Sequence, residues 1–383
     1  MVPLQSLCVL RELLNALGCY GLCSQCIIAL SMRHMKSVLQ AIIIGGLLVG
    51  CAKTQEKSVE QSDVMPPLNE TEQKELYDQA SALFPALPAS MPGGEADSPE
   101  LVALGRELYH DVRLSVNDKQ SCNTCHNVDN GGAGVDNETT SPGALGQRGA
   151  RNTPTSLNAG FHFVQFWDGR AEDLEAQAKG PVVNPIEMGM EGPKAVENKL
   201  RAIDSYKASF AAAFPSDKRS ISFGNVAKAI AAFERTLVSP SRYDAWINGD
   251  KKALSAQEQR GLHTFINAGC IACHNGTAFG GSMYQKLGLV NPYPSADAGR
   301  FAVTKDPADS LMFKVPSLRN VAVTWPYFHD GSVRTLKEAI RLMAWHQVGK
   351  KLSDNEVASI EIFLKSLTNE KITAKHTASL AVR

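Results

Sequence analysis

Two short strings of this sequence place two cysteines and a histidine in the same arrangement. The first is CNTCH at residues 122–126, and the second is CIACH at residues 270–274. In each string the thiols lie three residues apart in one tight turn, so each can form a thioether with one of the two vinyl groups of a haem. The histidine that follows is then held beneath the iron as an axial ligand. We therefore predict two c-type haem attachment sites. Their residues are Cys122, Cys125 and His126 in one string, and Cys270, Cys273 and His274 in the other.

The remaining cysteines favour this interpretation. The chain has nine cysteines, and a chain that begins at Cys51 keeps only that residue and the four in the two strings. No pair is then left over for a disulfide. A zinc half-site or a redox dithiol is the alternative use of two cysteines at this spacing, and the occurrence of two complete strings favours haem. The pair formed by Cys23 and Cys26 lacks the histidine.

Residues 32–51 are typical of an export signal. Residues 32–36 are basic, and residues 38–50 form an apolar run that is too short to span a bilayer as a helix. Cys51 follows Leu-Val-Gly, a pattern that resembles a bacterial lipoprotein cleavage site, so we expect it to be lipidated. An ordinary signal peptide or an uncleaved anchor is the alternative. Ala52 in the following position indicates the outer membrane, which predicts a periplasmic protein attached there as a lipoprotein.

Composition limits the class of protein. The chain has 383 residues, a formal net charge of zero and 20% charged residues, so its charge gives no argument for binding nucleic acid, while a local basic or acidic docking patch stays open. The length favours two domains and a leader. We expect a leader at residues 1–50, of which residues 1–31 resemble a misplaced translation start, and a lipoprotein tether at residues 51–95.

Helix signals repeat on both sides of the chain's midpoint. Ser98 and Pro99 begin one expected helix before the first string, and a capping box at residues 255–258 begins another before the second. Apolar residues at helical spacing predict closing helices at residues 225–237 and 353–367. Residues 69–84 are also predicted to be helical.

Strand signals are sparse, so the predicted fold is mainly α with two cytochrome c-like domains, each holding one covalent c-type haem. The expected domains are residues 96–240 and 241–383. The boundary lies near residues 238–250, where helical periodicity breaks at Ser239 and Pro240.

Met343 is the candidate second axial ligand of the later haem. Iron with histidine and methionine on its two faces has a raised potential and no open site, so it transfers electrons. Spacing alone favours Met343 as core filler, because Leu336 and Ile340 precede it on the same helical face.

Several stretches closely resemble the bacterial di-haem cytochrome c peroxidases, over residues 99–368. The matching stretches are the two CxxCH strings and residues 104–115, 150–188, 314–333 and 338–343. The resemblance implies an enzyme that reduces hydrogen peroxide to water. Its electrons would come from a small cytochrome c or a blue-copper protein, and members of the family are commonly homodimers.

The resemblance also implies roles for individual residues. His126 would ligate the peroxidatic haem, and His274 with Met343 would ligate the electron-transfer haem. Trp167 matches a tryptophan between the two haems, whereas a tryptophan taken alone is most often a packing residue. Gln177 and Glu187 match polar groups above the peroxidatic iron, where a carboxylate can move a proton between the peroxide oxygens. Without the resemblance, Glu187 is better interpreted as a surface glutamate.

A calcium site between the domains is implied in the same way. Asn152 and the backbone carbonyls of Thr324 and Pro326 match its ligands. Oxygen ligands of this kind, completed by water, suit a hard cation.

The sequence departs from the family at one position. Most members carry a histidine after the first string that caps the peroxidatic iron in the oxidised enzyme, and Ala144 stands in its place. Residues 127–150 contain no His, Met, Cys or Lys, and His162 is the nearest alternative ligand. We therefore expect a peroxidatic haem that is accessible without prior reduction.

Two other functions remain open. One is a di-haem protein that only transfers electrons, and the other is a protein-oxidising relative. Relatives that mature a tryptophan-derived cofactor usually have tyrosine in place of Met343, so this methionine favours a peroxidase.

Overall fold

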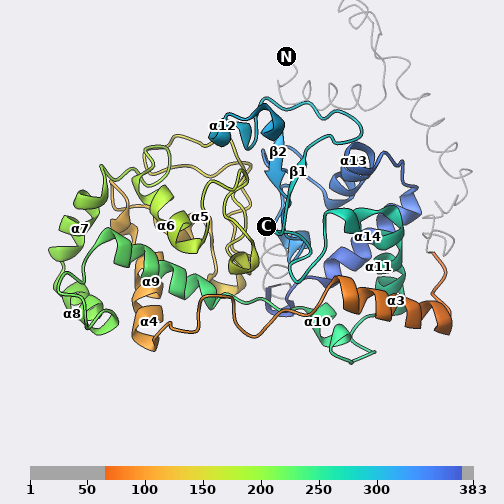
Figure 1. Ribbon diagram of the computed structural model, residues 1–383, viewed down its shortest axis with the longest axis horizontal. Helices are drawn as coiled ribbons and strands as arrows, with labels where there is room; N and C mark the ends of the chain where they lie inside the picture. The colour runs from red at the N-terminus through yellow and green to blue at the C-terminus, as the bar shows by residue number, and fades with distance from the viewer. Residues whose placement is uncertain (1–64, 373–383) are drawn as a thin grey trace, which may run out of the picture. The chain divides into compact units, whose positions relative to one another are not determined.

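The computed structural model describes residues 65–372 and is mainly helical there, as predicted (Figure 1). The α-helices are α3 Glu70–Leu83, α4 Pro99–His110, α5 Cys122–Cys125, α6 Leu174–Val183, α7 Pro193–Arg201, α8 Asp204–Ala213, α9 Phe223–Arg235, α10 Arg242–Ile247, α11 Ala256–Ala268, α12 Phe301–Thr304, α13 Leu336–Val348 and α14 Asp354–Ser366. Two short antiparallel strands, β1 Tyr284–Lys286 and β2 Met312–Lys314, pair with Tyr284 opposite Lys314.

Helices α4 and α9 pack against each other and form the first hydrophobic core. The Ser98 side chain caps α4 by accepting a hydrogen bond from the backbone N–H of Leu101. Apolar residues at helical spacing, among them Leu104 and Leu108, are then buried against α9. The two backbones approach closely because a Cβ at Gly105 would lie only 1.8 Å from the carbonyl oxygen of Ala229.

Helices α11 and α14 form the second core by the same plan. Both begin with capping boxes, the predicted one that pairs Ser255 with Glu258 and a second that pairs Ser353 with Glu356. A glycine again permits the crossing, since a Cβ at Gly261 would lie 2.1 Å from a carbonyl oxygen of α14. Each half of the chain thus has its own core, and the predicted two-domain division remains a prediction.

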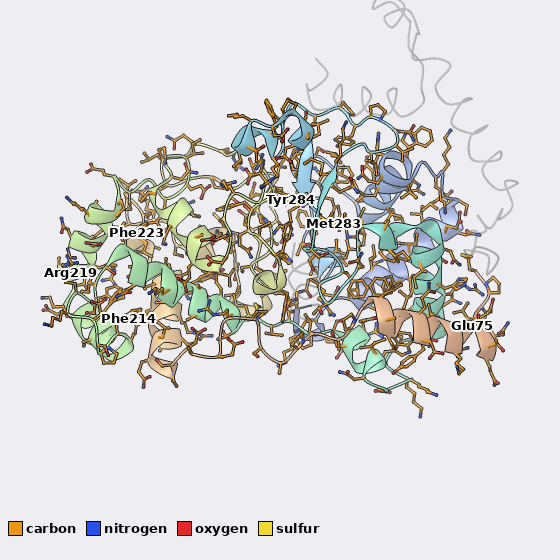
Figure 2. All side chains as sticks on the ribbon, in the orientation of Figure 1. Glu75, Phe214, Arg219, Phe223, Met283 and Tyr284 are labelled. Carbon is orange, nitrogen blue, oxygen red and sulfur yellow. The ribbon has the colours of Figure 1, made fainter. Side chains whose placement is uncertain are left out.

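The two strands belong to the second half of the sequence and contact the first half. Tyr284 of β1, labelled in Figure 2, has its hydroxyl 3.4 Å from the carbonyl oxygen of Gly169. Its ring also packs edge-on against Phe163, with centroids 5.0 Å apart. The strand pair therefore fixes the loop at residues 163–169 against the second half of the chain.

Helix α3 is present where residues 69–84 were expected to be helical, but it departs from the description of residues 51–95 as a tether. Leu76, Ala80 and Phe84 on this helix and its carboxyl end are completely buried in the second core. The ring of Tyr77 also packs edge-on against Trp246 of α10, with centroids 5.2 Å apart. This stretch stabilises the second core, and its polar composition did not reveal this, because only one face of the helix is apolar.

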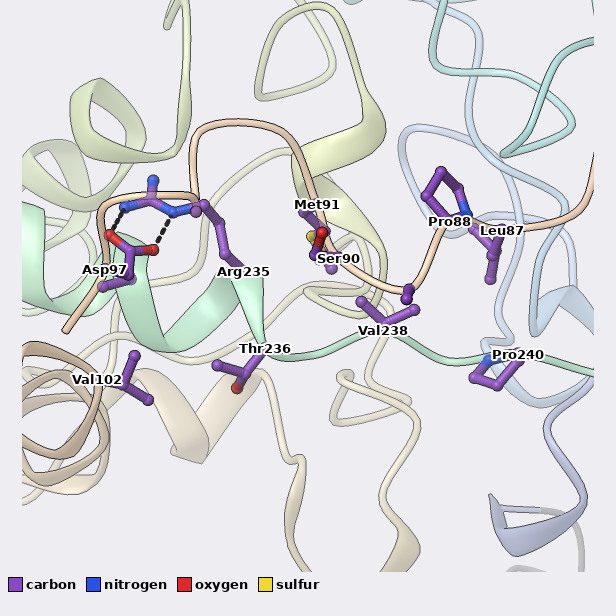
Figure 3. A pocket seen from close by; sticks show the side chains of 13 residues that line it. Leu87, Pro88, Ser90, Met91, Asp97, Val102, Arg235, Thr236, Val238 and Pro240 are labelled. Atoms are coloured by element: carbon purple, nitrogen blue, oxygen red, sulfur yellow. Dashed lines mark hydrogen bonds and ion pairs between the residues drawn. The ribbon is translucent and has the colours of Figure 1, made fainter. Parts of the chain in front are cut away.

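Two connecting segments, residues 87–97 and 236–240, run together between the cores (Figure 3). Arg235, at the end of α9 just before the second segment, forms two ion contacts with Asp97 of the first. Its Nε and Nη2 lie 2.6 and 2.8 Å from the two carboxylate oxygens. Arg319 is buried and binds both carboxylate oxygens of Asp244, which also accepts a hydrogen bond from the backbone of Leu87. The hollow between the segments has a volume of about 670 Å³, and no residue of either CxxCH string lines it.

Within residues 65–372, no helix is both long and apolar enough to cross a bilayer. The predicted leader at residues 1–50, the lipidated Cys51 and the first part of the tether lie outside the described residues.

The glycine crossing between α4 and α9 gives a first testable prediction. We expect Gly105→Ala to lower the free energy of unfolding by about 2–3 kcal/mol, because the added methyl group forces the two backbones apart. Gly224→Ala is the matched control, because it lies on α9 and its added methyl group would meet no atom within 4 Å. That control should leave stability unchanged or raise it by up to about 1 kcal/mol. Chemical denaturation measures both, and equal effects would contradict the packing argument.

Candidate functional site

The first CxxCH string lies against the first core. Cys122–Cys125 forms the single turn of α5, and Cys122 packs against the hydrophobic cluster beneath α4 and α9. The backbone N–H of His126 closes the turn by donating to the carbonyl of Cys122 at 2.9 Å. The Tyr109 hydroxyl then donates to the carbonyl of His126 at 2.8 Å. The turn therefore fixes both thiols and the imidazole relative to one another.

The imidazole of His126 is neutral at neutral pH and suited to binding a metal. Burial lowers its pKa, while the carbonyls of Gly134 and Pro154 act in the opposite direction. Its Nδ1 is buried without a hydrogen-bond partner of ordinary geometry. A neutral imidazole is the form that ligates haem iron.

A cavity of about 200 Å³ opens over this string. Its walls bring together seven of the predicted site residues, which are Cys122, Cys125, His126, Asn152, Trp167, Gln177 and Glu187. His162, the alternative ligand, lines the same cavity, and so do ionisable side chains that were not expected there, among them Glu234 and Lys314. The structure therefore gathers in one cavity the residues that the family resemblance implied for the first haem, whereas His274 and Met343 lie elsewhere.

Glu187 enters the cavity from the loop that follows α6. Its carboxylate accepts a hydrogen bond from the side-chain amide of Asn184 at 3.0 Å. Burial raises its pKa above the ordinary value, and the nearby Arg170 and the Asn184 hydrogen bond partly oppose this. A carboxylate with a raised pKa can accept and release a proton close to neutral pH. The alternative interpretation as a plain surface glutamate is therefore disfavoured.

Gln177 lies on the first turn of α6, whose start is fixed by the Asp173 side chain accepting from the backbone of Ala176. Ala178 on the same helix is buried, whereas the partly buried Gln177 contributes to the cavity wall. Helix α6 thus places the Gln177 amide in the same cavity as Glu187.

Ala144 lies in a loop that is bonded to the Glu187 segment. The backbone N–H of Ala144 donates to the carbonyl of Glu187 at 2.7 Å, and the Asn117 side chain donates to the carbonyl of Ala144. The loop is further closed by a bond from Gly143 to Gln147. The side chain at position 144 thus lies beside the segment that carries Glu187. In this chain that side chain is only the methyl group of an alanine.

Trp167 is held by both halves of the chain. Its indole N–H donates to the carbonyl of Asn152 at 2.9 Å, and its own carbonyl accepts from the backbone of Lys314 in β2 at 2.8 Å. The neighbouring Asp168 is buried and bonds Arg151, which also binds Asp297 of the second half. An aromatic ring fixed in this way is a suitable route between two redox centres.

The predicted calcium ligands lie in two loops that touch. Asn152 is buried, its side-chain nitrogen donates to the carbonyl of Glu138, and its backbone N–H donates to the carbonyl of His329. Thr324 and Pro326 belong to the segment that leads to His329. No group of three or more His, Cys, Asp or Glu side chains is placed to hold a metal within residues 65–372. That finding does not test the proposed set, which consists of one amide and two backbone carbonyls.

The second CxxCH string lies at the edge of the second core, where Cys270 packs against the buried cluster. The Nδ1 of His274 lies 3.1 Å from the carbonyl of Phe279, a contact that orients the ring and leaves Nε2 for a metal. Met343 follows Leu336 and Ile340 on one face of α13, but it is only partly buried while they are buried. The role of Met343 as a haem ligand remains a prediction.

The residues present therefore fit two c-type haems. All four cysteines of the strings are unpaired and partly accessible, and the imidazole that ends each string is partly buried. The cavity at the first string is largely apolar, as a porphyrin requires.

Sequence reasoning did not predict Glu234 or Lys314 as site residues. Glu234 follows Phe233 near the end of α9, and burial raises its pKa to about 8. The only available signal was a carboxylate directly after the mostly apolar stretch at residues 226–233. Lys314 stands beside the apolar residues of β2, and nothing local indicates that it faces His162, which is 152 positions away.

Comparison with known proteins agrees with this geometry. The model of the di-haem cytochrome c peroxidase family matches residues 99–252. The cytochrome c551 peroxidase of Pseudomonas aeruginosa is 48% identical over 304 residues, which cover 77% of this chain and 87% of that protein. The cytochrome c551 peroxidase of Nitrosomonas europaea is 44% identical over 278 residues, covering 72% and 82% of the two chains.

Solved structures show the same fold. A MauG-like protein associated with microbial copper homeostasis superposes with a TM-score of 0.65 at 32% identity, over 75% of this chain and 93% of that one. The di-haem peroxidase BthA of Burkholderia thailandensis, at 22% identity, superposes with a TM-score of 0.61 over 76% and 95% of the two chains. The chain therefore belongs to the di-haem cytochrome c peroxidases, a family of oxidoreductase enzymes.

Proposed function

We propose that this protein reduces hydrogen peroxide to water with electrons from a small cytochrome c or blue-copper protein. The observation that carries the proposal is the single cavity that joins His126 to Trp167, Gln177 and Glu187. A haem attached at Cys122 and Cys125 would supply the iron and the electrons for peroxide reduction. The overall reaction consumes two electrons and two protons for each peroxide and releases two waters.

Glu187 has the central proton-transfer role in this proposal. Its carboxylate takes a proton from one peroxide oxygen and delivers it to the other, which leaves as water. Gln177 orients peroxide by hydrogen bonding through its amide. The Asn184 amide holds the carboxylate in place during both transfers.

Electrons reach the cavity from the second attachment string. His274 and Met343 would give that haem two strong ligands and a raised potential, which suits it to accept electrons from the donor protein. Trp167 is bonded to Asn152 of one half and to Lys314 of the other, so it provides the connection between the two haems.

A protein-oxidising function is the second candidate. The methylamine utilization protein MauG of Paracoccus denitrificans is 36% identical over 304 residues. Met343, in place of the tyrosine usual in that group, favours the peroxidase.

The same proposal includes a bound calcium ion, a cellular location and an oligomeric state. Asn152 and the carbonyls of Thr324 and Pro326 would bind the calcium between the two halves. The predicted leader and the lipidated Cys51 would place the enzyme in the periplasm, at the outer membrane. A homodimer is the expected assembly.

The role of Glu187 can be tested by one isosteric change. Glu187→Gln should reduce peroxide turnover by about 100-fold or more, because the amide cannot accept the proton. In the unchanged enzyme, turnover should fall as the pH is lowered through the raised pKa of Glu187, because protonation removes the base. The variant should lose this dependence. Glu191→Gln, an exposed neighbour on the same loop, is the control, and steady-state assays across pH make the comparison.

A second test concerns the methyl group at position 144. The oxidised enzyme should react with peroxide without prior reduction, because residues 127–150 offer no strong ligand for the iron. Ala144→His should introduce a lag that prereduction removes. Leu145→His is the matched control, because that side chain is 61% exposed and should bring no histidine to the cavity. Stopped-flow measurements decide, and a long lag in the unchanged oxidised enzyme would refute the open site.

A further inference from the structure

Lys314 is a buried cation without a buried anion to neutralise it. The residue is 6% exposed, at the end of β2, and forms no ion pair with any carboxylate of residues 65–372. Its ammonium contacts the Nδ1 of His162 at 3.0 Å. Burying an ammonium with only a neutral partner costs several kcal/mol, so a native site of this kind normally has a counter-ion.

Asp168, the carboxylate whose charge acts on Lys314, already forms ion pairs with two arginines. Asp168 acts on Lys314 only at a distance, and its oxygens bind Arg151 at 2.6 Å and Arg170 at 3.0 Å. Burial accordingly lowers the pKa of Lys314 to about 7. Burial, followed by the charge of Lys314, lowers the pKa of His162 well below its usual value.

The hydrogen-bond donors of this pair exceed its acceptors. A neutral His162 that accepts from Lys314 through Nδ1 carries its hydrogen on Nε2. That Nε2 is inaccessible to water and has no partner among the described residues. Lys314 has three donors and uses one. Both side chains line the cavity above the first CxxCH string, so unmatched donors from two residues lie at one wall of it.

The space for the imidazole is also specific. A Cβ at Gly281 would lie 2.3 Å from Cδ2 of His162, so this ring fits only beside a glycine. The backbone around it is fixed on both sides, because Phe163 donates to the carbonyl of Gly281 and Gly281 donates to that of Val315. The pair is thus held rigidly by segments from both halves of the chain.

We propose that Lys314 and His162 bind a carboxylate inside this cavity, namely a propionate of the haem attached at Cys122 and Cys125. The inference rests on the proposed haem attachment. The ammonium and the Nε2–H together supply a positive charge and two donor groups, the combination that a desolvated carboxylate requires. Because Lys314 also donates its backbone N–H to Trp167, the same residue positions the propionate and the tryptophan.

Removal of the cation should shift a redox potential. In the holoenzyme, Lys314→Met should lower the midpoint potential of the first haem, because a buried positive charge near a haem favours its reduced form. His162→Leu should lower it by a smaller amount, because only one donor is lost. The potential of the second haem should stay unchanged and serves as an internal reference. Lys199→Met is the matched control, since that lysine lies in the half that carries the first CxxCH string and binds Ser115 and Asp118, away from the cavity.

This experiment distinguishes failure of the propionate assignment from failure of the proposed peroxidase function. A potentiometric titration followed by electron paramagnetic resonance separates the two haems, after mass spectrometry has counted the covalent haems. If both haems are attached and neither variant shifts the first potential, the carboxylate assignment is overturned and the haem sites stand. If the unchanged protein carries no haem at the first string, the proposed function itself fails. Should one variant not fold, the other still decides, because each removes a different donor.

Discussion

The close crossing of two helices in each half of the chain is the constraint on which the sites depend. Helices α4 and α9 meet at Gly105, and α11 and α14 meet at Gly261, with no room for a side chain at either point. Cys122 and Cys270, the first cysteine of each string, pack against the cores that these crossings create. The thiols and imidazoles are therefore positioned by backbone contacts, and the long loops that carry Glu187 and Trp167 are arranged around them.

Local hydrogen bonding explains which elements could be predicted from the sequence. The boxes at Ser255 and Ser353 are complete within four residues, so the starts of α11 and α14 were correct. The predicted helix at residues 225–237 instead begins at Phe223 and ends at Arg235. Ser222 caps its start, which the apolar spacing did not reveal, and the tighter bonds of Thr236 and Leu237 end it. Periodicity locates the buried face of a helix more reliably than its ends.

Contacts between distant segments explain what could not be predicted. Helix α3 packs against Trp246 of α10, and the contact between His162 and Lys314 joins a loop of the first half to strand β2 of the second. Neither has a local signal. The roles of Gln177 and Glu187 came from the family resemblance, and in isolation Glu187 is better interpreted as a surface residue. The structure adds that a single cavity holds both, and that burial shifts the pKa of this carboxyl in the direction that proton transfer needs.

Trp167 connects the predicted calcium site to the proposed propionate site, because both its side chain and its backbone carbonyl form hydrogen bonds. Its indole reaches the carbonyl of Asn152, a predicted calcium ligand, and its carbonyl reaches Lys314, the proposed propionate partner. Binding of a cation at Asn152 and of a carboxylate at Lys314 would therefore restrain the same ring from opposite sides. Since electron transfer depends on where that ring lies, both sites would act on the rate at which electrons arrive. Glu187 lies outside this set of bonds, so proton transfer and electron delivery are positioned by separate contacts in one cavity.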